Sequence, residues 1–127
     1  AARKDVLPVA ICQDPQAVEK HHGIPALFFR QRAAVAQLVD ACDAVILGPG
    51  GIIQAGICPA YGKNLLVYGQ FYYFYPAKLA RAQRKPVLCV GVGAEKLVSD
   101  GIGPLMGELF QASPLLWLRD ENSKKNF

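Results

Sequence analysis

The sequence lacks the features of several protein classes. None of its apolar runs reaches the roughly 18 uninterrupted residues that a membrane span needs, and no apolar signal core follows the charged opening residues. Lys and Arg are scattered and never form a basic run of five or more, so the formal net charge of +4 does not indicate a nucleic-acid partner. We therefore expect a cytoplasmic protein without a membrane span. Its mild positive excess suits a small phosphorylated molecule or an ordinary solvated surface.

Metal-binding patterns are also missing. The four cysteines form no CxxC pair and have no histidine at zinc-ligand spacing. We interpret them as buried, reduced thiols, and we predict neither a metal nor a cofactor. The two histidines, His21 and His22, are far in sequence from any partner for a catalytic triad and are interpreted as a surface helix end.

What the sequence does contain is the composition and pattern of one α/β domain. Its 127 residues are 52% hydrophobic and 19% charged, without an internal repeat or linker, so we predict a single domain over residues 1–127. Short apolar runs alternate with helical patterns, which is typical of an open, mostly parallel, Rossmann-like sheet with helices on both faces. The predicted strands are 6–12, 44–47, 87–90 and 115–118, with a shorter candidate at 26–29.

Helices are predicted between these strands. Asp14 as N-cap and Pro15 at the first position start a helix over 15–22, which Gly23 ends. Apolar residues at helical spacing predict further helices over 31–42, 71–83 and 104–111, and a last one begins after Asp120. Arg81, Arg84 and Lys85 would lie at the negative end of the 71–83 helix dipole.

Two glycine-rich segments follow predicted strands, where parallel sheets bind ligands. They are Gly48-Pro49-Gly50-Gly51-Ile52-Ile53-Gln54 and Gly91-Val92-Gly93-Ala94-Glu95. We predict two turns whose backbone amides approach an anion, although each alone is as typical of a tight turn. Neither is a Walker loop or a full dinucleotide fingerprint. The predicted binding residues here are Gly50, Gly51, Gln54, Gly91 and Gly93.

A third candidate segment, Arg119-Asp120-Glu121, follows the last predicted strand. Arg119 would pair with a carboxylate or phosphate in bidentate fashion, while Asp120 or Glu121 would cap the helix or orient a sugar hydroxyl. In the alternative, Arg119 only bridges to an acidic neighbour and Asp120 only caps. The aromatic residues between 68 and 75 are assigned to the core or an interface rather than to sugar stacking.

The order of these segments resembles the polysaccharide pyruvyl transferase family along nearly the whole chain. The family shows "NDP", "HG", "D-x-V-I-x-G-G-G-x-L-L-Q-D", "GKPV", "G-Q-G-I-G-P" and "R-D-E-x-S". The corresponding stretches here are Gln13-Asp14-Pro15, His22-Gly23, Asp43 to Gln54, Arg84-Lys85-Pro86-Val87, Gly91-Val92-Gly93 and Arg119-Asp120-Glu121-Asn122-Ser123. Pro49, Ala55 and Glu95 depart from the family pattern.

The resemblance implies a transferase that moves a pyruvyl group from phosphoenolpyruvate to a sugar of a cell-envelope glycan. It implies half of a two-domain GT-B-like architecture, and a chain that matches an incomplete N-terminal domain and is inactive without a second domain or an oligomer partner. The catalytic residues are not assigned by it. Two alternatives remain: a GT-B glycosyltransferase that uses a nucleotide sugar, and a non-catalytic binding or assembly module, which the three departures favour.

Overall fold

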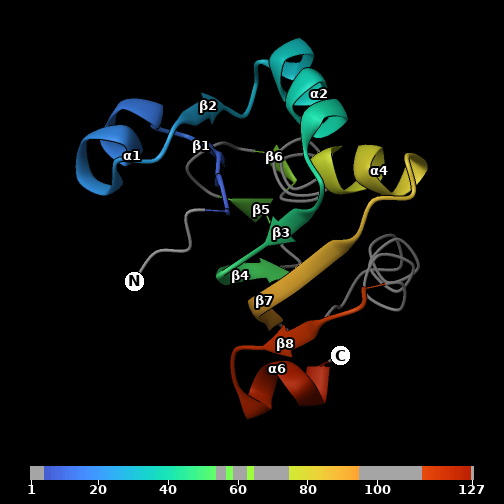
Figure 1. Ribbon diagram of the computed structural model, residues 1–127. Helices are drawn as coiled ribbons and strands as arrows, with labels where there is room; N and C mark the ends of the chain where they lie inside the picture. Colours follow the sequence, from blue (N-terminus) through green and yellow to red (C-terminus); the bar gives the residue numbers. More distant parts are fainter. Residues whose placement is uncertain (1–4, 54–56, 59–62, 65–74, 95–112, 127) are drawn as a thin grey trace.

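The structure, a computed structural model, describes residues 5–53, 57–58, 63–64, 75–94 and 113–126 (Figure 1). Its helices and strands follow one another as an α/β chain. In order they are β1 (Ala10–Cys12), α1 (Pro15–His22), β2 (Ala26–Phe28), α2 (Arg32–Ala41), β3 (Val45–Leu47), β4 (Gly50–Ile53), β5 (Ile57–Cys58), β6 (Lys63–Asn64), α4 (Tyr75–Ala82), β7 (Val87–Ala94), β8 (Leu116–Leu118) and α6 (Glu121–Asn126).

A parallel sheet forms the centre of the described part. Strand β7 pairs in parallel with β3 and then β4 along one edge and with β8 along the other. In Figure 1, β7 accordingly runs between β3 and β4 on one side and β8 on the other. The predicted fold class, an open parallel α/β sheet of the Rossmann-like kind, is confirmed.

The first strand belongs to a separate pair. Strand β1 pairs in parallel with β2, and both are three residues long. The short candidate strand at 26–29 is therefore confirmed, while the strand predicted over 6–12 begins only at Ala10. Val6 and Leu7, which precede it, are exposed. A second separate pair, β5 with β6, is antiparallel.

Helix α1 begins and ends as its sequence predicts. The Asp14 side chain accepts a hydrogen bond from the Ala17 amide at 3.0 Å, and Pro15 occupies the first helical position. Gly23 ends the helix with φ +63°, a left-handed conformation that glycine adopts without strain.

The core lies between the sheet and two helices. Val35 and Val39 of α2 and Ala77 and Ala80 of α4 are buried in one cluster with the strand residues Leu47, Val87, Cys89 and Val92. On the other face, Ile46 is 63% exposed and Trp117 is 62% exposed. Helices α2 and α4 thus cover one face, and the burial expected on both faces of the strands does not extend to these two side chains.

The end of α4 is held by its own backbone and then joined to α2. Arg84 has φ +58°, its amide bonds the Arg81 carbonyl, and the Lys85 amide bonds the Ala80 carbonyl, the two bonds of a Schellman motif. The Lys85 ammonium donates to the carbonyls of Val39 and Asp40, both at 2.6 Å. Lys85 was predicted to complement the dipole of its own helix, and instead it caps the carboxyl end of α2.

Parts of two predictions fall outside the described residues. These are the helix predicted over 104–111 and the first residues of the helix predicted over 71–83. Among the residues that are described, none belongs to a helix with the length and apolar character required to traverse a bilayer.

Candidate functional site

Among the described residues, most of each glycine-rich segment is strand rather than turn. Gly50 and Gly51 lie in β4, which follows β3 after an interruption at Gly48 and Pro49, and Gly91 and Gly93 lie in β7, which runs on to Ala94. Gly50 pairs with Val92. The prediction of two turns was wrong because the backbone groups of each segment find partners in the neighbouring strand, which outweighs the weak strand preference of glycine.

Two of the glycines are explained by close packing within the sheet. Gly48 has φ +114°, and a Cβ placed on it would lie 2.0 Å from the Val90 carbonyl oxygen. Gly91 has φ +65°, and a Cβ there would lie 3.2 Å from the Pro49 Cβ. Glycine is required at both positions by backbone conformation and space, so neither position needs a ligand to account for it.

Gly93 stands apart because its neighbour is a charged side chain. A Cβ on Gly93 would lie 2.8 Å from Arg119 Cζ, 3.0 Å from Nη1 and 3.1 Å from Nη2. The Arg119 amide also donates to the Val92 carbonyl at 2.9 Å, which fixes the start of that side chain beside β7. The parallel sheet therefore brings Gly93 and Arg119, 26 positions apart in sequence numbering, into contact.

Arg119 and Asp120 form a salt bridge at the start of α6. Arg119 Nε donates to Asp120 Oδ2 at 2.8 Å, and the Ser123 amide donates to Asp120 Oδ1 at 2.7 Å. The Arg119 hydrogen bond and then the Ser123 amide lower the pKa of Asp120 to about 2. Both bonds were foreseen as the structural alternative for these residues, and both are present.

The terminal nitrogens of Arg119 are not engaged in this bridge. Within the part of the chain that the structure describes, Nη1 and Nη2 have no hydrogen-bond partner, and the side chain is 56% exposed. A guanidinium bound through Nε still presents two parallel N–H groups at its outer edge. That edge has the geometry that binds a carboxylate or phosphate in bidentate fashion.

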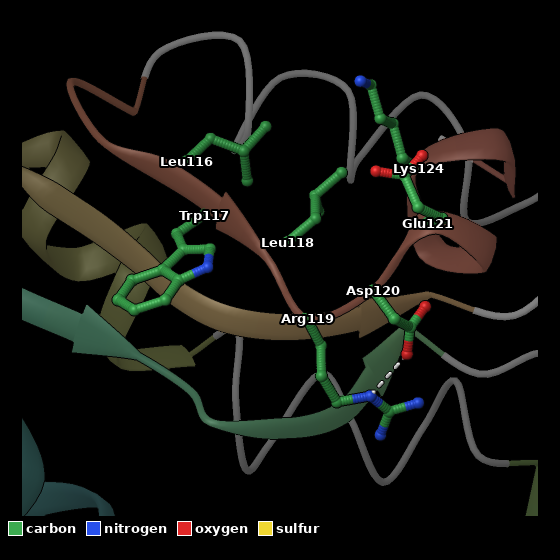
Figure 2. A pocket seen from close by; sticks show the side chains of 7 residues that line it. All are labelled: Leu116, Trp117, Leu118, Arg119, Asp120, Glu121 and Lys124. Carbon is green, nitrogen blue, oxygen red and sulfur yellow. Dashed lines mark hydrogen bonds and ion pairs between the residues drawn. The ribbon is translucent and has the colours of Figure 1, made fainter.

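An open hollow of about 510 Å³ surrounds this segment. Its lining residues are Leu116, Trp117, Leu118, Arg119, Asp120, Glu121 and Lys124 (Figure 2). The charges of Arg119 and Lys124 balance those of Asp120 and Glu121, so the hollow has no net positive charge. An anion would therefore be attracted by N–H groups that point at it rather than by an overall positive potential. Figure 2 shows Arg119 and Trp117 on one side of β8, and Leu116 and Leu118 on the other.

Trp117 was not among the predicted site residues. It was interpreted as part of a buried apolar strand, and its exposure on the same side of β8 as Arg119 follows only from the sheet. The signal that would have found it is the alternation of strand side chains, which places residues 117 and 119 on one face.

The remaining predicted residues lie as follows. Glu121 is the first residue of α6 and lines the hollow. Gln54 falls outside the described residues. Gly51 follows Gly50 in β4, on the strand adjacent to β7. The carboxyl ends of β4, β7 and β8 thus share one edge of the sheet, since all three are parallel.

Other candidates stay apart from this edge. His21 and His22 are exposed at the end of α1, as predicted. Tyr75 packs against the core, with the Arg32 guanidinium 5.7 Å from its ring centroid, and so belongs to the contact between α2 and α4. Cys89 is buried, and burial raises the pKa of its thiol, as expected for an unreactive core cysteine, whereas Cys12 and Cys42, also predicted to be buried, are only half-buried.

The fold and this edge define a class: a Rossmann-like parallel domain with polar groups at the carboxyl ends of its strands, where such domains bind small ligands. A family model described as polysaccharide pyruvyl transferase matches residues 3–127. The chain therefore belongs to the polysaccharide pyruvyl transferase family, which is a transferase family. Comparison with curated proteins and with solved structures found no significant match.

Proposed function

We propose that this chain contributes the donor site for transfer of a pyruvyl group from phosphoenolpyruvate to a sugar of a cell-envelope glycan. Its family membership supports the reaction class. In the transfer, two sugar hydroxyl oxygens bond to the enol carbon of the donor to form a cyclic ketal. One hydroxyl proton goes to the methylene carbon, and the other leaves with inorganic phosphate.

The observation that carries the proposal is the outer edge of Arg119. The donor has a carboxylate and a phosphate, and each offers a pair of oxygens that matches two parallel N–H groups. Arg119 lies at the carboxyl end of the sheet, with Nε already held by Asp120 and with Nη1 and Nη2 unbonded by any residue that the structure describes. A donor held there would also lie near the carboxyl ends of β4 and β7, which are parallel neighbours in the sheet.

The acceptor would lie against Trp117. Its ring is exposed and shares a side of β8 with Arg119 (Figure 2). Residues two apart on a strand are about 7 Å apart, a separation that suits a sugar ring beside a small donor. Aromatic rings provide an apolar platform for such a ring. A GT-B-like architecture, with further donor-binding residues from a second domain, is part of this proposal.

Calorimetric titration of the full-length protein with phosphoenolpyruvate tests the proposal. We expect Arg119→Ala to weaken binding by about 10-fold or more, because charge-assisted bonds are lost from a site that is otherwise near neutral. Lys78→Ala, which removes an exposed cation from α4, is the matched control and should bind as the unaltered protein does. Equal binding by the unaltered protein and Arg119→Ala would refute the donor site.

Assays of enzymatic activity distinguish pyruvyl transfer from the two alternative functions. Release of inorganic phosphate from phosphoenolpyruvate in the presence of a sugar acceptor supports pyruvyl transfer. Turnover of a nucleotide sugar instead would replace it with a GT-B glycosyltransferase. Binding without turnover of either donor would identify a non-catalytic module, which the departure at Pro49 favours.

A further inference from the structure

The contact between Gly93 and Arg119 has a definite geometry. An atom placed directly above Cζ at 2.8 Å, on the normal to the guanidinium plane, is about 3.1 Å from each nitrogen when the C–N bonds are about 1.33 Å long. The Cβ position of Gly93 lies 3.0 Å from Nη1 and 3.1 Å from Nη2. The guanidinium therefore lies flat over Gly93, with its plane against the main chain of β7.

The flat contact requires glycine. Carbon atoms in ordinary contact are roughly 3.5–4.0 Å apart, so a methyl group whose carbon is 2.8 Å from Cζ would lift the guanidinium by about 1 Å or turn it. Unlike Gly48 and Gly91, Gly93 does not have a positive φ. The requirement at residue 93 is thus one of space for the guanidinium rather than of backbone conformation.

A second contact fixes the rotation of the same group. Asp120 holds Nε at 2.8 Å, and Asp120 is in turn held by the Ser123 amide at 2.7 Å. The backbone at Gly93 sets the plane of the guanidinium, and Asp120 sets its direction within that plane. Among the described residues, no group bonds to the remaining edge, which Nη1 and Nη2 form.

From these contacts we propose that Gly93 and Asp120 are positioning residues, which hold the Arg119 guanidinium flat on β7 so that its Nη1–Nη2 edge meets the anionic donor in a fixed orientation. This inference rests on the proposed function. It assigns Gly93 a different role from the predicted one, because Gly93 would act through Arg119 and not by offering its own amide to the ligand. A pre-oriented guanidinium loses less freedom on binding, so a guanidinium displaced by a methyl group at residue 93 should bind the donor more weakly.

The test is a double-mutant cycle in the full-length protein, read as the dissociation constant of phosphoenolpyruvate. Gly93→Ala alone should weaken binding by about 10-fold or more. In the Arg119→Ala background, Gly93→Ala should produce no further loss, because the group that it displaces is absent. Equal losses in both backgrounds, or unaltered binding by Gly93→Ala, would overturn the inference.

Asp120→Asn provides an independent arm if Gly93→Ala does not fold. Asparagine is as good an N-cap as aspartate, so the bond from the Ser123 amide is kept, while the charged acceptor for Nε is lost. We expect binding weakened by about 3-fold or more, while the far-ultraviolet circular dichroism spectrum stays that of the folded, unaltered protein. Unchanged binding by Asp120→Asn would remove Asp120 from the proposal.

Titrations with inorganic phosphate and with pyruvate identify the group that meets Arg119. The probe that Gly93→Ala binds more weakly is the group held by the Nη1–Nη2 edge of Arg119. If Gly93→Ala binds phosphoenolpyruvate more weakly but binds both phosphate and pyruvate as the unaltered protein does, a direct contact is contradicted. The proposed function is tested separately. If Arg119→Ala binds phosphoenolpyruvate as the unaltered protein does, the proposed donor site is refuted. If Arg119→Ala weakens binding and Gly93→Ala does not, only the positioning role fails.

Discussion

Replacing Lys85 by methionine tests whether a single side chain joins the two helices that cover the sheet. Its ammonium donates to the carbonyls of Val39 and Asp40 at 2.6 Å each, at the end of α2. These carbonyls lie in the last turn, where the helix offers them no backbone amide, although the Val39 carbonyl also accepts a weak hydrogen bond from Cys42 Sγ at 3.4 Å. Methionine keeps the length and most of the apolar stem while removing the charge and both bonds.

The expected loss follows from the two bonds and the helix dipole. A hydrogen bond to a charged group contributes roughly 1.5–3 kcal/mol, and a cation at a helix carboxyl end roughly 0.3–1 kcal/mol. The bond to Asp40 is exposed and water replaces it readily, whereas the bond to Val39 is partly buried. Counting one bond in full and little from the other, we expect the free energy of unfolding to fall by about 2 kcal/mol.

Urea unfolding followed by far-ultraviolet circular dichroism measures this change. A loss of about 2 kcal/mol corresponds to a fall in Tm of roughly 6–12 °C for a chain of this size. Lys78→Met, on the exposed surface of α4, is the control and should stay within about 0.5 kcal/mol of the unaltered protein. If Lys85→Met were as stable as that control, the junction between α2 and α4 would not depend on Lys85.

Two other predictions concern Arg84 and Asp120. Arg84 has φ +58° at the end of α4, a conformation that glycine adopts without strain, so Arg84→Gly should raise the free energy of unfolding in urea by roughly 0.5–1 kcal/mol. A lower free energy of unfolding would show that the Arg84 side chain stabilises the fold by more than this strain costs. The Asp120 carboxyl should titrate with a pKa of about 2 in carbon-detected NMR. Arg119→Ala should raise that pKa toward 3.8 without reaching it, because the hydrogen bond from the Ser123 amide remains. Because folding lowers this pKa, the ionised Asp120 carboxylate stabilises the folded state. That stabilisation is fully present above pH 3.8 and is lost as the pH falls through about 2. An unchanged pKa in Arg119→Ala would refute the bridge.

Local features were predicted most closely. The capping of α1 by Asp14 and its termination at Gly23 depend on groups within a few residues of each other, and both were as expected. The α/β class also follows from local pattern, because alternating strand and helix segments of this length pack only as a parallel sheet covered by helices. The family was apparent from short motifs whose order is a property of the sequence itself.

Several contacts between distant segments were not predicted. Lys85 was assigned to its own helix because the position of the α2 carbonyls depends on how α2 and α4 pack. The glycine segments were assigned to turns because a sequence does not show which backbone groups find partners in the adjacent strand. Cytoplasmic location and the single-domain assignment stay predictions.

Thus the sequence by itself determined the class of fold, the family and the chemistry available at the edge of the sheet, since these depend on residue type and on local order. The tertiary structure alone decided that Gly48 and Gly91 allow the Gly48–Pro49 connection to pack closely on β7, and that Gly93 lies under the Arg119 guanidinium. The physical reason is that strand register sets which residues meet across a sheet, and register is determined by pairing over the whole strand rather than by any single residue.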